Sequence, residues 1–507
     1  MTNKPNILIL MVDQLNGQLF ADGPADFLQV PTLRKLHSRG VNFSNTYCAS
    51  PLCSPARASF MCGSLPSANG VYDNAAEFVS SLPTFAHSLR ALGYQTILSG
   101  KMHFVGADQL HGFEERLTTD IYPADFGWTP DWRKPNERID WWYHNLGSVT
   151  GAGIAATSNQ LEFDDEVAYH AKLKLHQLAR RDDDQPFCLT VSFTHPHDPY
   201  VTRQKYWDLY ENVEIPEVQV PRMSYADQDP HSRRLYEAVD YQNFAISPED
   251  VTQARRAYCA NISYLDEKMG EILATLEECQ LSDETIVIFT ADHGDMIGER
   301  GLWYKMSFFE GSMRVPLLMH APQRFANKTI TEPVSVLDLV PTLIELGGGT
   351  AEDQTIATHG RSLLDCAEGN SQPQHPVLAE YAAEGSVDPM LMIREGEWKF
   401  NYCEADPPQL FNLQQDPLEL NNLAEDPDQQ TRVQSFTEQV HSQWDLAAFR
   451  QDVLDSQRNR LTVYQGLRQG SYQPWDFQPS QDATERYMRN HLDLNVLESQ
   501  ARFPREK

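Results

Sequence analysis

The chain has 507 residues, an ordinary hydrophobic content of 41% and a formal net charge of -30. A chain of this length is too long to fold around one minimal hydrophobic core, but it suits a domain built on a large α/β sheet with a smaller second domain. The negative charge disfavours nucleic acid as a partner, because its phosphates would be repelled. No run of eighteen apolar residues occurs, so we expect no membrane span.

The first residues, MTNKPNILILMVDQLNG, predict a buried strand at 6–13. They lack the basic leader and small-residue cleavage site of a signal peptide. The eight cysteines are unevenly spaced, which does not indicate a disulfide framework. We therefore expect a protein of the reducing cytoplasm.

Further apolar, β-branched runs recur along the chain, each followed by a polar turn. They lie at 94–101, 187–195, 285–295 and 315–322. Before the third run, a helix that begins near Ser247 is predicted by apolar residues spaced three and four apart. Continuous apolar strands separated by helices predict a large mixed, mostly parallel sheet sandwiched by helices.

The sequence pattern changes after about residue 375, where short aromatic runs are separated by Pro, Asp and Asn. This pattern predicts a small antiparallel sheet. We expect an α/β catalytic domain at 1–375, a small C-terminal α+β subdomain at 376–445 and a helical tail at 446–507.

Several of the predicted strands end in polar, ionisable side chains. These are Asp13 and Gln14, Lys101 and His103, His195 and His197, and Asp292 and His293. Each alone would most often be a helix cap or a core histidine, but ligands of open α/β sheets bind beyond the carboxyl ends of the strands. The set of Asp13, Gln14, Asp292 and His293 is rich in oxygen and suits Ca²⁺, Mg²⁺ or Mn²⁺.

The segment CSPAR at 53–57 resembles the C-x-P-x-R signature of sulfatases, in which a dedicated enzyme oxidises the cysteine to formylglycine. FFEGSMRVP at 308–316 and LFNLQQDPLELNNL at 410–423 extend the likeness to nearly the whole chain. RLTTDIYPADFGWTP and SFTHPHDPY resemble more narrowly the choline sulfatases, which belong to the formylglycine sulfatases of the alkaline phosphatase superfamily.

The resemblance implies a role for each polar or charged residue of the predicted active site. Cys53, as formylglycine, would be the nucleophile and Arg57 would hold its hydrate. The implied ligands of Ca²⁺ or Mn²⁺ are Asp13, Gln14, Asp292 and His293. The residues implied to stabilise charge and transfer protons are Lys101, His103, His197 and Lys305. Of these, His197 or Lys305 would protonate the leaving oxygen, and His103 would be the base that releases sulfate.

The implied reaction is hydrolysis of choline-O-sulfate to choline and sulfate. A quaternary ammonium can be held only by aromatic faces and carboxylates. We predict that Trp128, His144 and Glu384 hold it, with Asn74 as a hydrogen-bond donor to the substrate; Trp141, Trp142 and Tyr143 are further aromatic candidates. Because choline sulfate is a zwitterion, the acidic surface would neither attract nor repel it strongly.

Two alternatives remain open at this stage. Many sulfatases carry Asp in place of Gln14 and Asn in place of His293, and the Gln and His combination occurs in phosphonate monoester hydrolases. The chain could therefore hydrolyse phosphonate monoesters or phosphodiesters, or be a broader sulfatase, on the same scaffold. A catalytically inactive, metal-stabilised binding protein, in which Cys53 stays a thiol, is the other alternative.

The resemblance also implies partners. Maturation would require a formylglycine-generating enzyme. The tail around His491–Asn495 resembles a segment that reaches a neighbouring subunit in choline sulfatases, which implies a homo-oligomer, expected to be a tetramer.

Overall fold

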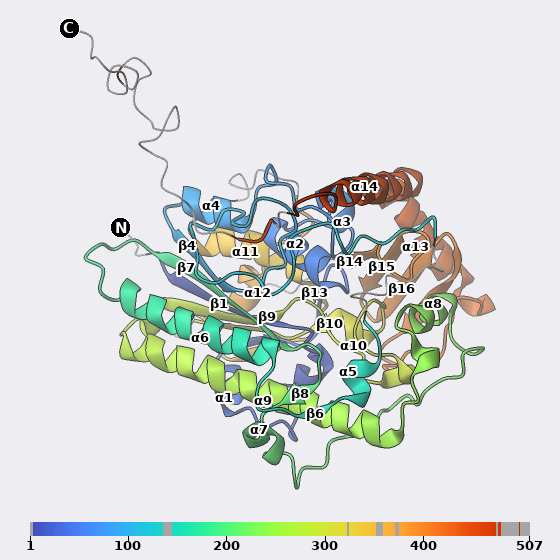
Figure 1. The fold of residues 1–507 in the computed structure, drawn as a ribbon, viewed down its shortest axis with the longest axis horizontal. Helices are drawn as coiled ribbons and strands as arrows, with labels where there is room; N and C mark the ends of the chain where they lie inside the picture. The colour runs from blue at the N-terminus through green and yellow to red at the C-terminus, as the bar shows by residue number, and fades with distance from the viewer. Residues whose placement is uncertain are drawn as a thin grey trace.

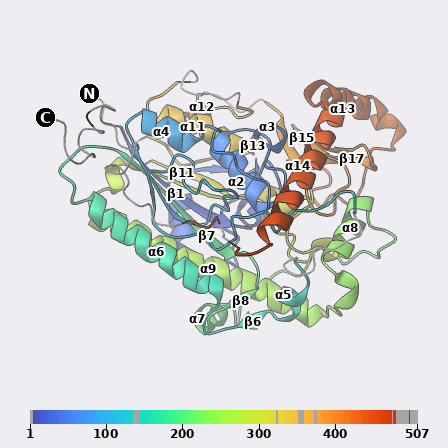
Figure 2. The same ribbon diagram turned by 45° about the horizontal axis from the view of Figure 1, so that its top comes forward.

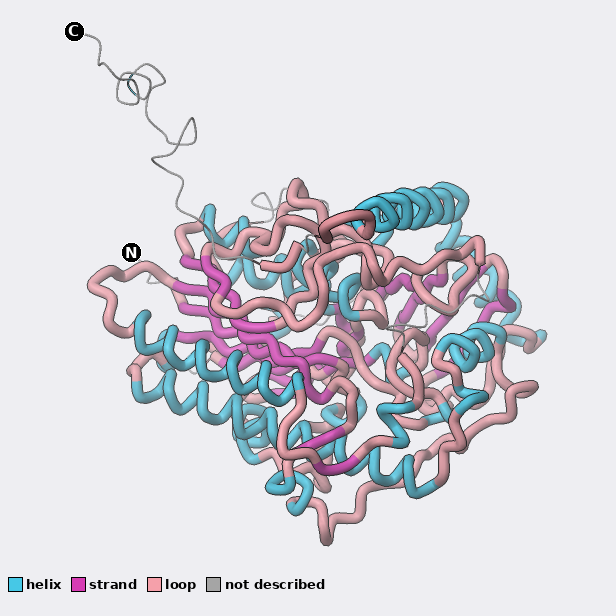
Figure 3. Tube along the Cα trace, viewed as in Figure 1, coloured by secondary structure: helices cyan, strands magenta, loops and turns pink. Residues whose placement is uncertain are grey.

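The computed structural model describes residues 4–134, 144–321, 324–350, 358–370, 375–472, 475–477 and 496. A large sheet runs through the molecule with helices on both faces (Figure 1, Figure 3). Its strands, in spatial order, are β12 (Lys328–Ile330), β2 (Val41–Phe43), β11 (Leu317–His320), β9 (Thr285–Ala291), β1 (Asn6–Asp13), β7 (Phe187–Pro196), β4 (Gln95–Gly100) and β5 (Glu115–Arg116).

The pairing of these strands is mostly parallel. β1 runs parallel to β7 and β9, and β4 runs parallel to β7 and β5. Only β11 pairs antiparallel with its neighbours, β9 and β2. The carboxyl ends of β9, β1, β7 and β4 therefore meet at one edge, which confirms the predicted mixed, mostly parallel sheet.

Strand β1 shows why this sheet is covered on both faces. Leu8, Leu10 and Val12 join the core with helices α6 (Asn159–Leu178) and α9 (Pro248–Glu278). The alternate residues, from Ile7 to Met11, join a second core with α2 (Cys53–Cys62), α4 (Phe85–Ala91) and α11 (Leu339–Leu346). Since successive side chains of a strand point to opposite faces, an unbroken apolar run is what two cores require.

Helix α9 begins where the sequence predicts. The Ser247 side chain caps the backbone amide of Asp250, and the Asp250 carboxylate accepts from the amide of Ser247. Pro248 occupies the first turn, where its missing N–H is no loss. The two bonds form a capping box, and the predicted start of the helix near Ser247 is confirmed.

The remaining helices of the catalytic layer are shorter. They are α1 (Pro31–His37), α2 (Cys53–Cys62), α3 (Pro66–Asn69), α4 (Phe85–Ala91), α5 (Gly147–Thr150), α7 (Gln204–Asp208), α8 (Pro230–Ala238), α10 (Glu310–Met313), α11 (Leu339–Leu346) and α12 (Leu364–Glu368). Two minor sheets join β10 (Arg314–Val315) with β3 (Thr46–Tyr47) and β13 (Val334–Ser335), and β6 (Gly153–Ile154) with β8 (Val201–Thr202). The predicted strand at 315–322 is thus divided at Pro316, which cannot donate to a ladder.

A four-stranded antiparallel sheet follows, as predicted. It consists of β14 (Val377–Tyr381), β15 (Met390–Glu395), β16 (Trp398–Cys403) and β17 (Asp406–Asn412). Helices α13 (Gln430–Gln443) and α14 (Leu446–Leu467) come next in the chain. Lys399 of β16 is fully buried between Glu310 (2.9 Å) and Glu419 (2.6 Å), so an internal ion-pair network ties this sheet to α10.

Among the described residues, no helix is both long enough and apolar enough to cross a membrane.

Candidate active site

Cys53 lies at the start of α2, close to the carboxyl edge of the large sheet. Its Sγ is 3.2 Å from His293 Nε2 and 3.9 Å from Asp13 Oδ1. The side chain is 2% exposed, so these neighbours and not water surround it. The predicted nucleophile therefore lies beside two predicted metal ligands that come from different strands.

Arg57, one turn further along α2, joins the two strand ends. Its Nε donates to Asp292 Oδ2 and one terminal nitrogen donates to Asp13 Oδ2, both at 2.8 Å. The other terminal nitrogen donates to the carbonyl of Lys101 (2.7 Å) and to Ser192 Oγ (2.9 Å). The guanidinium thus holds the carboxylates in place, while its predicted hold on the Cys53 hydrate stays a prediction.

Two buried lysines make this end of the site strongly positive. Lys101 Nζ contacts Asp13 Oδ2, and Lys305 Nζ donates to Gln14 Oε1 (2.6 Å) and His197 Nε2 (2.7 Å). Burial disfavours ionisation of the Cys53 thiol, but Lys101, Lys305 and His293 outweigh it and hold its pKa well below the ordinary value. The same arrangement would stabilise the negative charge of a sulfuryl group during transfer.

Gln14 follows β1 in the left-handed backbone region, with φ of 63°. Its Nε2 donates to Asp295 Oδ2 at 2.7 Å, and its Oε1 accepts from Lys305. Because Asp295 can only accept from the amide, the amide oxygen is the atom that faces the site.

The four predicted metal ligands fit a hard divalent cation. Ligand atoms of Asp13, Asp292 and His293 lie, together with Cys53 Sγ, within 4.8 Å of one another. His293 Nδ1 contacts the carbonyl of Gly294 at 3.0 Å, an arrangement that leaves Nε2 toward the site with its lone pair. Burial raises the pKa of Asp13, yet Lys101, His197 and Arg57 together hold it below its usual range, so this carboxylate stays ionised.

A cavity of about 260 Å³ opens beside Cys53. Of the predicted residues, it is lined by Cys53, Asn74, His103, Trp128, His144, His197 and Lys305. Asn74 Oδ1 accepts from the amide of Ser54 at 3.0 Å, which leaves the amide nitrogen of its side chain as the donor toward the cavity. Residues separated by up to 252 positions in the chain, Cys53 and Lys305, therefore share one small pocket.

One wall of this cavity is aromatic. Tyr122 packs against Trp128 with ring centres 5.3 Å apart, and His103 lies 5.0 Å from Tyr122 and 5.7 Å from Trp128. Lys101 Nζ lies 4.2 Å from the centre of the Tyr122 ring. Tyr122 thus connects the reacting end of the pocket with its aromatic wall.

His144 and Asp198 also line the cavity. The His144 ring stacks on Tyr304 at 4.6 Å, and its Nδ1 lies 3.5 Å from Asp198 Oδ2. His197 Nδ1 lies 3.2 Å from Asp198 Oδ1. Burial opposes ionisation of Asp198, but His197, His144 and Lys305 hold its pKa below the usual range, so an anion faces the cavity.

Sequence reasoning missed Tyr122 and Asp198. Asp198 follows His197 directly in HPHDPY, and Tyr122 lies in the aromatic segment that contains Trp128. For Asp198 the available indication was its position next to the predicted His197. For Tyr122 it was the aromatic segment that it shares with Trp128.

Glu384 is buried but does not line the cavity. Within the described residues neither of its carboxylate oxygens has a hydrogen-bond partner. Burial and the nearby Asp73 carboxylate raise its pKa to about 8. Trp141, Trp142, Tyr143 and the tail residues His491–Asn495 lie outside the described residues.

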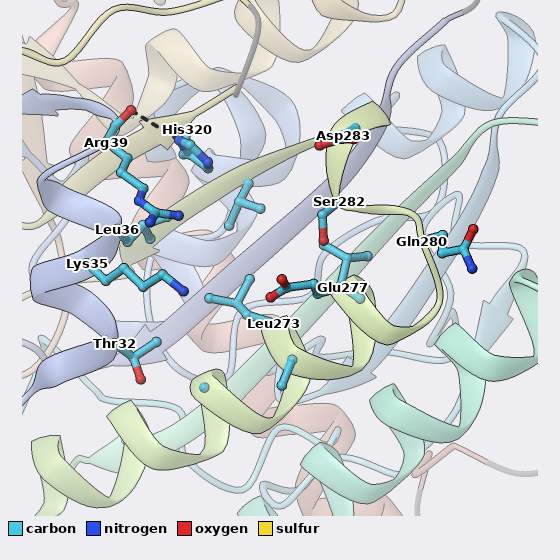
Figure 4. Close-up of a pocket in the computed structure, with 14 residues that line it drawn as sticks. Thr32, Lys35, Leu36, Arg39, Leu273, Glu277, Gln280, Ser282, Asp283 and His320 are labelled. Carbon is cyan, nitrogen blue, oxygen red and sulfur yellow. Dashed lines mark hydrogen bonds between the residues drawn. The ribbon is translucent and has the colours of Figure 1, made fainter.

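A larger groove, of about 1070 Å³, lies elsewhere on the molecule (Figure 4). It is formed by α1, the end of α9 and β11, with Leu36, Leu273 and Val287 among its lining residues. Asp283 and Val287 place it at the amino end of β9, whereas Asp292 follows the carboxyl end of that strand. No predicted site residue lines this groove, so we assign the chemistry to the smaller cavity.

Comparison with known proteins shows the family of the chain. The family model described as Sulfatase matches residues 5–349. The chain belongs to the sulfatase family. Sulfatases are enzymes that hydrolyse sulfate esters, and the matched range includes the predicted metal ligands, Cys53 and Lys305.

Two further family models match the C-terminal part of this sulfatase. The model described as N-sulphoglucosamine sulphohydrolase, C-terminal, matches residues 298–445, and the one described as Choline sulfatase enzyme C terminal matches residues 451–503. Part of α14 falls within the second match.

Individual proteins are also similar to this sulfatase, in sequence or in fold. The sulfatase is 59% identical to a choline-sulfatase of Rhizobium meliloti (strain 1021), with 99% of each chain covered. It is 27% identical to an arylsulfatase of Clostridium perfringens (strain 13 / Type A), over 81% of this chain and 90% of that one. In fold it is similar to a phosphonate monoester hydrolase of Agrobacterium radiobacter, with a TM-score of 0.69, 21% identity, and 86% and 95% of the two chains covered.

Proposed function

We propose that this sulfatase hydrolyses choline-O-sulfate to choline and sulfate. The observation that carries the proposal is a single small cavity with a cationic end at Cys53 and Lys305, beside the predicted metal ligands, and an aromatic wall at Tyr122 and Trp128. The 59% identity to a choline-sulfatase, over nearly the whole of both chains, supports the same substrate.

At the reacting end, Cys53 is the proposed nucleophile after conversion to formylglycine by a formylglycine-generating enzyme. The hydrated aldehyde would supply the attacking hydroxyl, and Ca²⁺ or Mn²⁺ held by Asp13, Gln14, Asp292 and His293 would acidify it. Lys101 and Lys305 neutralise charge on the sulfuryl oxygens, because both are buried within contact of the metal ligands.

Protons move through two histidines that line the cavity together with Cys53. His197 Nε2 receives a hydrogen bond from Lys305 at 2.7 Å, so this pair can deliver a proton to the leaving oxygen of choline. Burial lowers the pKa of His103, which keeps its imidazole neutral and suited to act as the base that releases sulfate.

The quaternary ammonium is placed against Tyr122, Trp128 and His144. Aromatic faces attract a cation that has no hydrogen to donate, and the ionised Asp198 adds a full negative charge on the same cavity. Glu384 is buried near Asp73 without lining the cavity, and it would attract the ammonium group only in its ionised form.

We further propose a homotetramer in which the tail near His491–Asn495 approaches a neighbouring pocket, and a cytoplasmic location. The location is supported by all eight cysteines being free thiols in the structure, as expected in a reducing compartment.

One experiment tests the proposed chemistry in two parts. The tryptic peptide 40–57 contains Cys53, and conversion to formylglycine removes one sulfur and two hydrogens and adds one oxygen, which mass spectrometry detects. Incubation of the modified enzyme with choline sulfate should then release choline and sulfate in equal amounts. An unmodified peptide from enzyme that still turns over would contradict the nucleophile, and absence of both products from modified enzyme would contradict the substrate.

A second candidate function is hydrolysis of phosphonate monoesters. It is favoured by Gln14 and His293 among the metal ligands, the combination found in those hydrolases. The aromatic wall and Asp198 favour choline sulfate.

A further inference from the structure

Helix α14 contacts the loops that carry two of the pocket residues (Figure 2). Arg460 of α14 donates to both carboxylate oxygens of Asp73, at 2.7 and 2.6 Å. It also donates to Thr129 Oγ1 at 3.0 Å. Asp73 precedes Asn74 and Thr129 follows Trp128, so one guanidinium connects the two segments on which these pocket residues lie.

The first of these segments is shaped by Asp73 itself. Its Oδ1 accepts from the amide of Ala75 at 2.9 Å, and its carbonyl accepts from the amide of Ala76 at 3.1 Å. Asn74, in the middle of this turn, accepts from the amide of Ser54 and so reaches the start of α2 next to Cys53. A shift of the Asp73 carboxylate would therefore move the side chain of Asn74.

The second segment is a loop without regular structure. Thr129 Oγ1 donates to the carbonyl of Phe126 at 2.8 Å and accepts from Arg460. Trp128 lies inside the turn that this bond closes, and its ring forms the aromatic wall with Tyr122. Since no strand supports the turn, its position depends on such contacts.

Other residues of α14 also contact the segments around the pocket. Gln457 Oε1 accepts from the amide of Trp132 at 2.9 Å, and Trp132 Nε1 donates to the carbonyl of Ala383, next to Glu384. Phe449 packs against Tyr72 with ring centres 5.8 Å apart. The helix therefore contacts two segments around the pocket, at 72–73 and 129–132, and through Trp132 it supports a third at Ala383.

Arg460 suits this task better than any other residue type would. It is 5% exposed, and the Asp73 side chain is fully buried. A planar fork can bind one carboxylate through two nitrogens and still reach a third acceptor, whereas a lysine is a single point charge. Because a buried pair of this kind is costly to form, its value lies more in fixing geometry than in net stability.

We propose that Arg460 is a positioning residue that sets the preference of the pocket for a quaternary-ammonium ester, by holding the Asn74 and Trp128 segments at their present separation. The inference deepens the proposed function and rests on it. It also gives a reason why part of the segment matched as Choline sulfatase enzyme C terminal, residues 451–503, lies against the substrate pocket of its own chain.

The test compares Arg460→Met with Arg458→Met in the formylglycine-containing enzyme. Arg458 lies on the same helix, but its side chain is 56% exposed and pairs only with Asp455 within the described residues. The readouts are kcat and KM for choline sulfate and for 4-nitrophenyl sulfate. We expect Arg460→Met to lower the ratio of the two kcat/KM values about tenfold, mainly through KM of choline sulfate, because small displacements of positioning groups are costly. Arg458→Met should leave both substrates unchanged.

A merely structural role would lower both activities by the same factor and leave their ratio unchanged, and this result would overturn the inference. If Arg460→Met does not fold, Thr129→Val leaves the Arg460–Asp73 pair intact and removes only the two hydrogen bonds of the Thr129 hydroxyl, with Arg460 and with Phe126. It should lower the same ratio by a smaller factor; an unchanged ratio would again overturn the inference. Arg460→Lys should recover only part of the ratio, since full recovery would mean that charge alone suffices. The wild-type ratio measures the proposed function separately, because that function fails if the unmutated enzyme does not favour choline sulfate.

Discussion

The reacting end of the pocket and its aromatic wall are built on different supports. Asp13 is the last residue of β1, and Lys101 and Asp292 directly follow β4 and β9. Buried ion pairs of Arg57 with Asp13 and Asp292, and of Lys101 with Asp13, fix these residues. Tyr122, Trp128 and His144 lie on loops, held by ring contacts and by distant residues such as Arg460. In the proposed reaction the edge of the sheet carries the bond-breaking chemistry, and the loops carry the choice of substrate.

The strongest test of the reacting end is Cys53→Ala. Removal of the nucleophile should lower kcat by at least about 10⁴-fold on every sulfate ester, because the remaining residues cannot replace a covalent step. Thermal unfolding followed by circular dichroism should show a folded protein. Cys62→Ala, at the other end of α2, is the matched control and should remain active.

Substantial turnover by Cys53→Ala, at more than a few per cent of wild type, would refute a formylglycine mechanism.

His197→Ala should have the next largest effect. Loss of the proposed proton donor should lower kcat on choline sulfate about 10²- to 10³-fold, because an alkoxide departs poorly without protonation. With 4-nitrophenyl sulfate the loss should be much smaller, since nitrophenolate needs no proton to leave. Equal losses on both esters would assign His197 to charge stabilisation and remove it as the acid.

Trp128→Ala tests the loop-borne wall. We expect about a tenfold drop in kcat/KM for choline sulfate, through loss of a cation–π contact, and little change for an aryl sulfate. Trp398→Ala, in the four-stranded sheet, controls for the loss of a large aromatic side chain. If both esters suffer equally from Trp128→Ala, the residue serves packing and not recognition.

The smallest effect concerns pH. Burial and Asp73 raise the pKa of Glu384 to about 8, so its carboxylate is mostly protonated at pH 7 and ionises as pH rises. Only the ionised form attracts an ammonium group, so kcat/KM for choline sulfate should rise severalfold between pH 7 and 9 relative to that for an aryl sulfate. Glu384→Gln should remove this relative rise; if the rise persists in that variant, another group is responsible.

The same contrast explains what the sequence could predict. Strands β1, β4, β7 and β9 and the cap of α9 follow from local apolar runs and turn chemistry, and parallel strand ends bring their polar residues together. The roles of Cys53 and Arg57 came from a resemblance, because nothing local distinguishes a reactive cysteine from a buried one.

The aromatic wall could be predicted only in part. Trp128 and His144 line the cavity as expected, but Tyr122 and Asp198 carry no periodic pattern of their own. The link between Asp73 and Arg460 spans 387 positions, and no local rule can pair residues so far apart. Glu384 was expected at the pocket, but it is buried and is not among the residues that line the cavity, because burial of a carboxylate cannot be read from the residues beside it.

The most direct test of the central claim is kcat/KM of the formylglycine-containing enzyme on choline sulfate, an aryl sulfate and a phenyl phosphonate monoester, measured side by side. The account predicts a clear preference for choline sulfate, which would establish both the reaction and the quaternary-ammonium pocket. A preference for the phosphonate would contradict it: the Gln14 and His293 ligand set would then determine the substrate, and Tyr122, Trp128 and His144 would be packing residues.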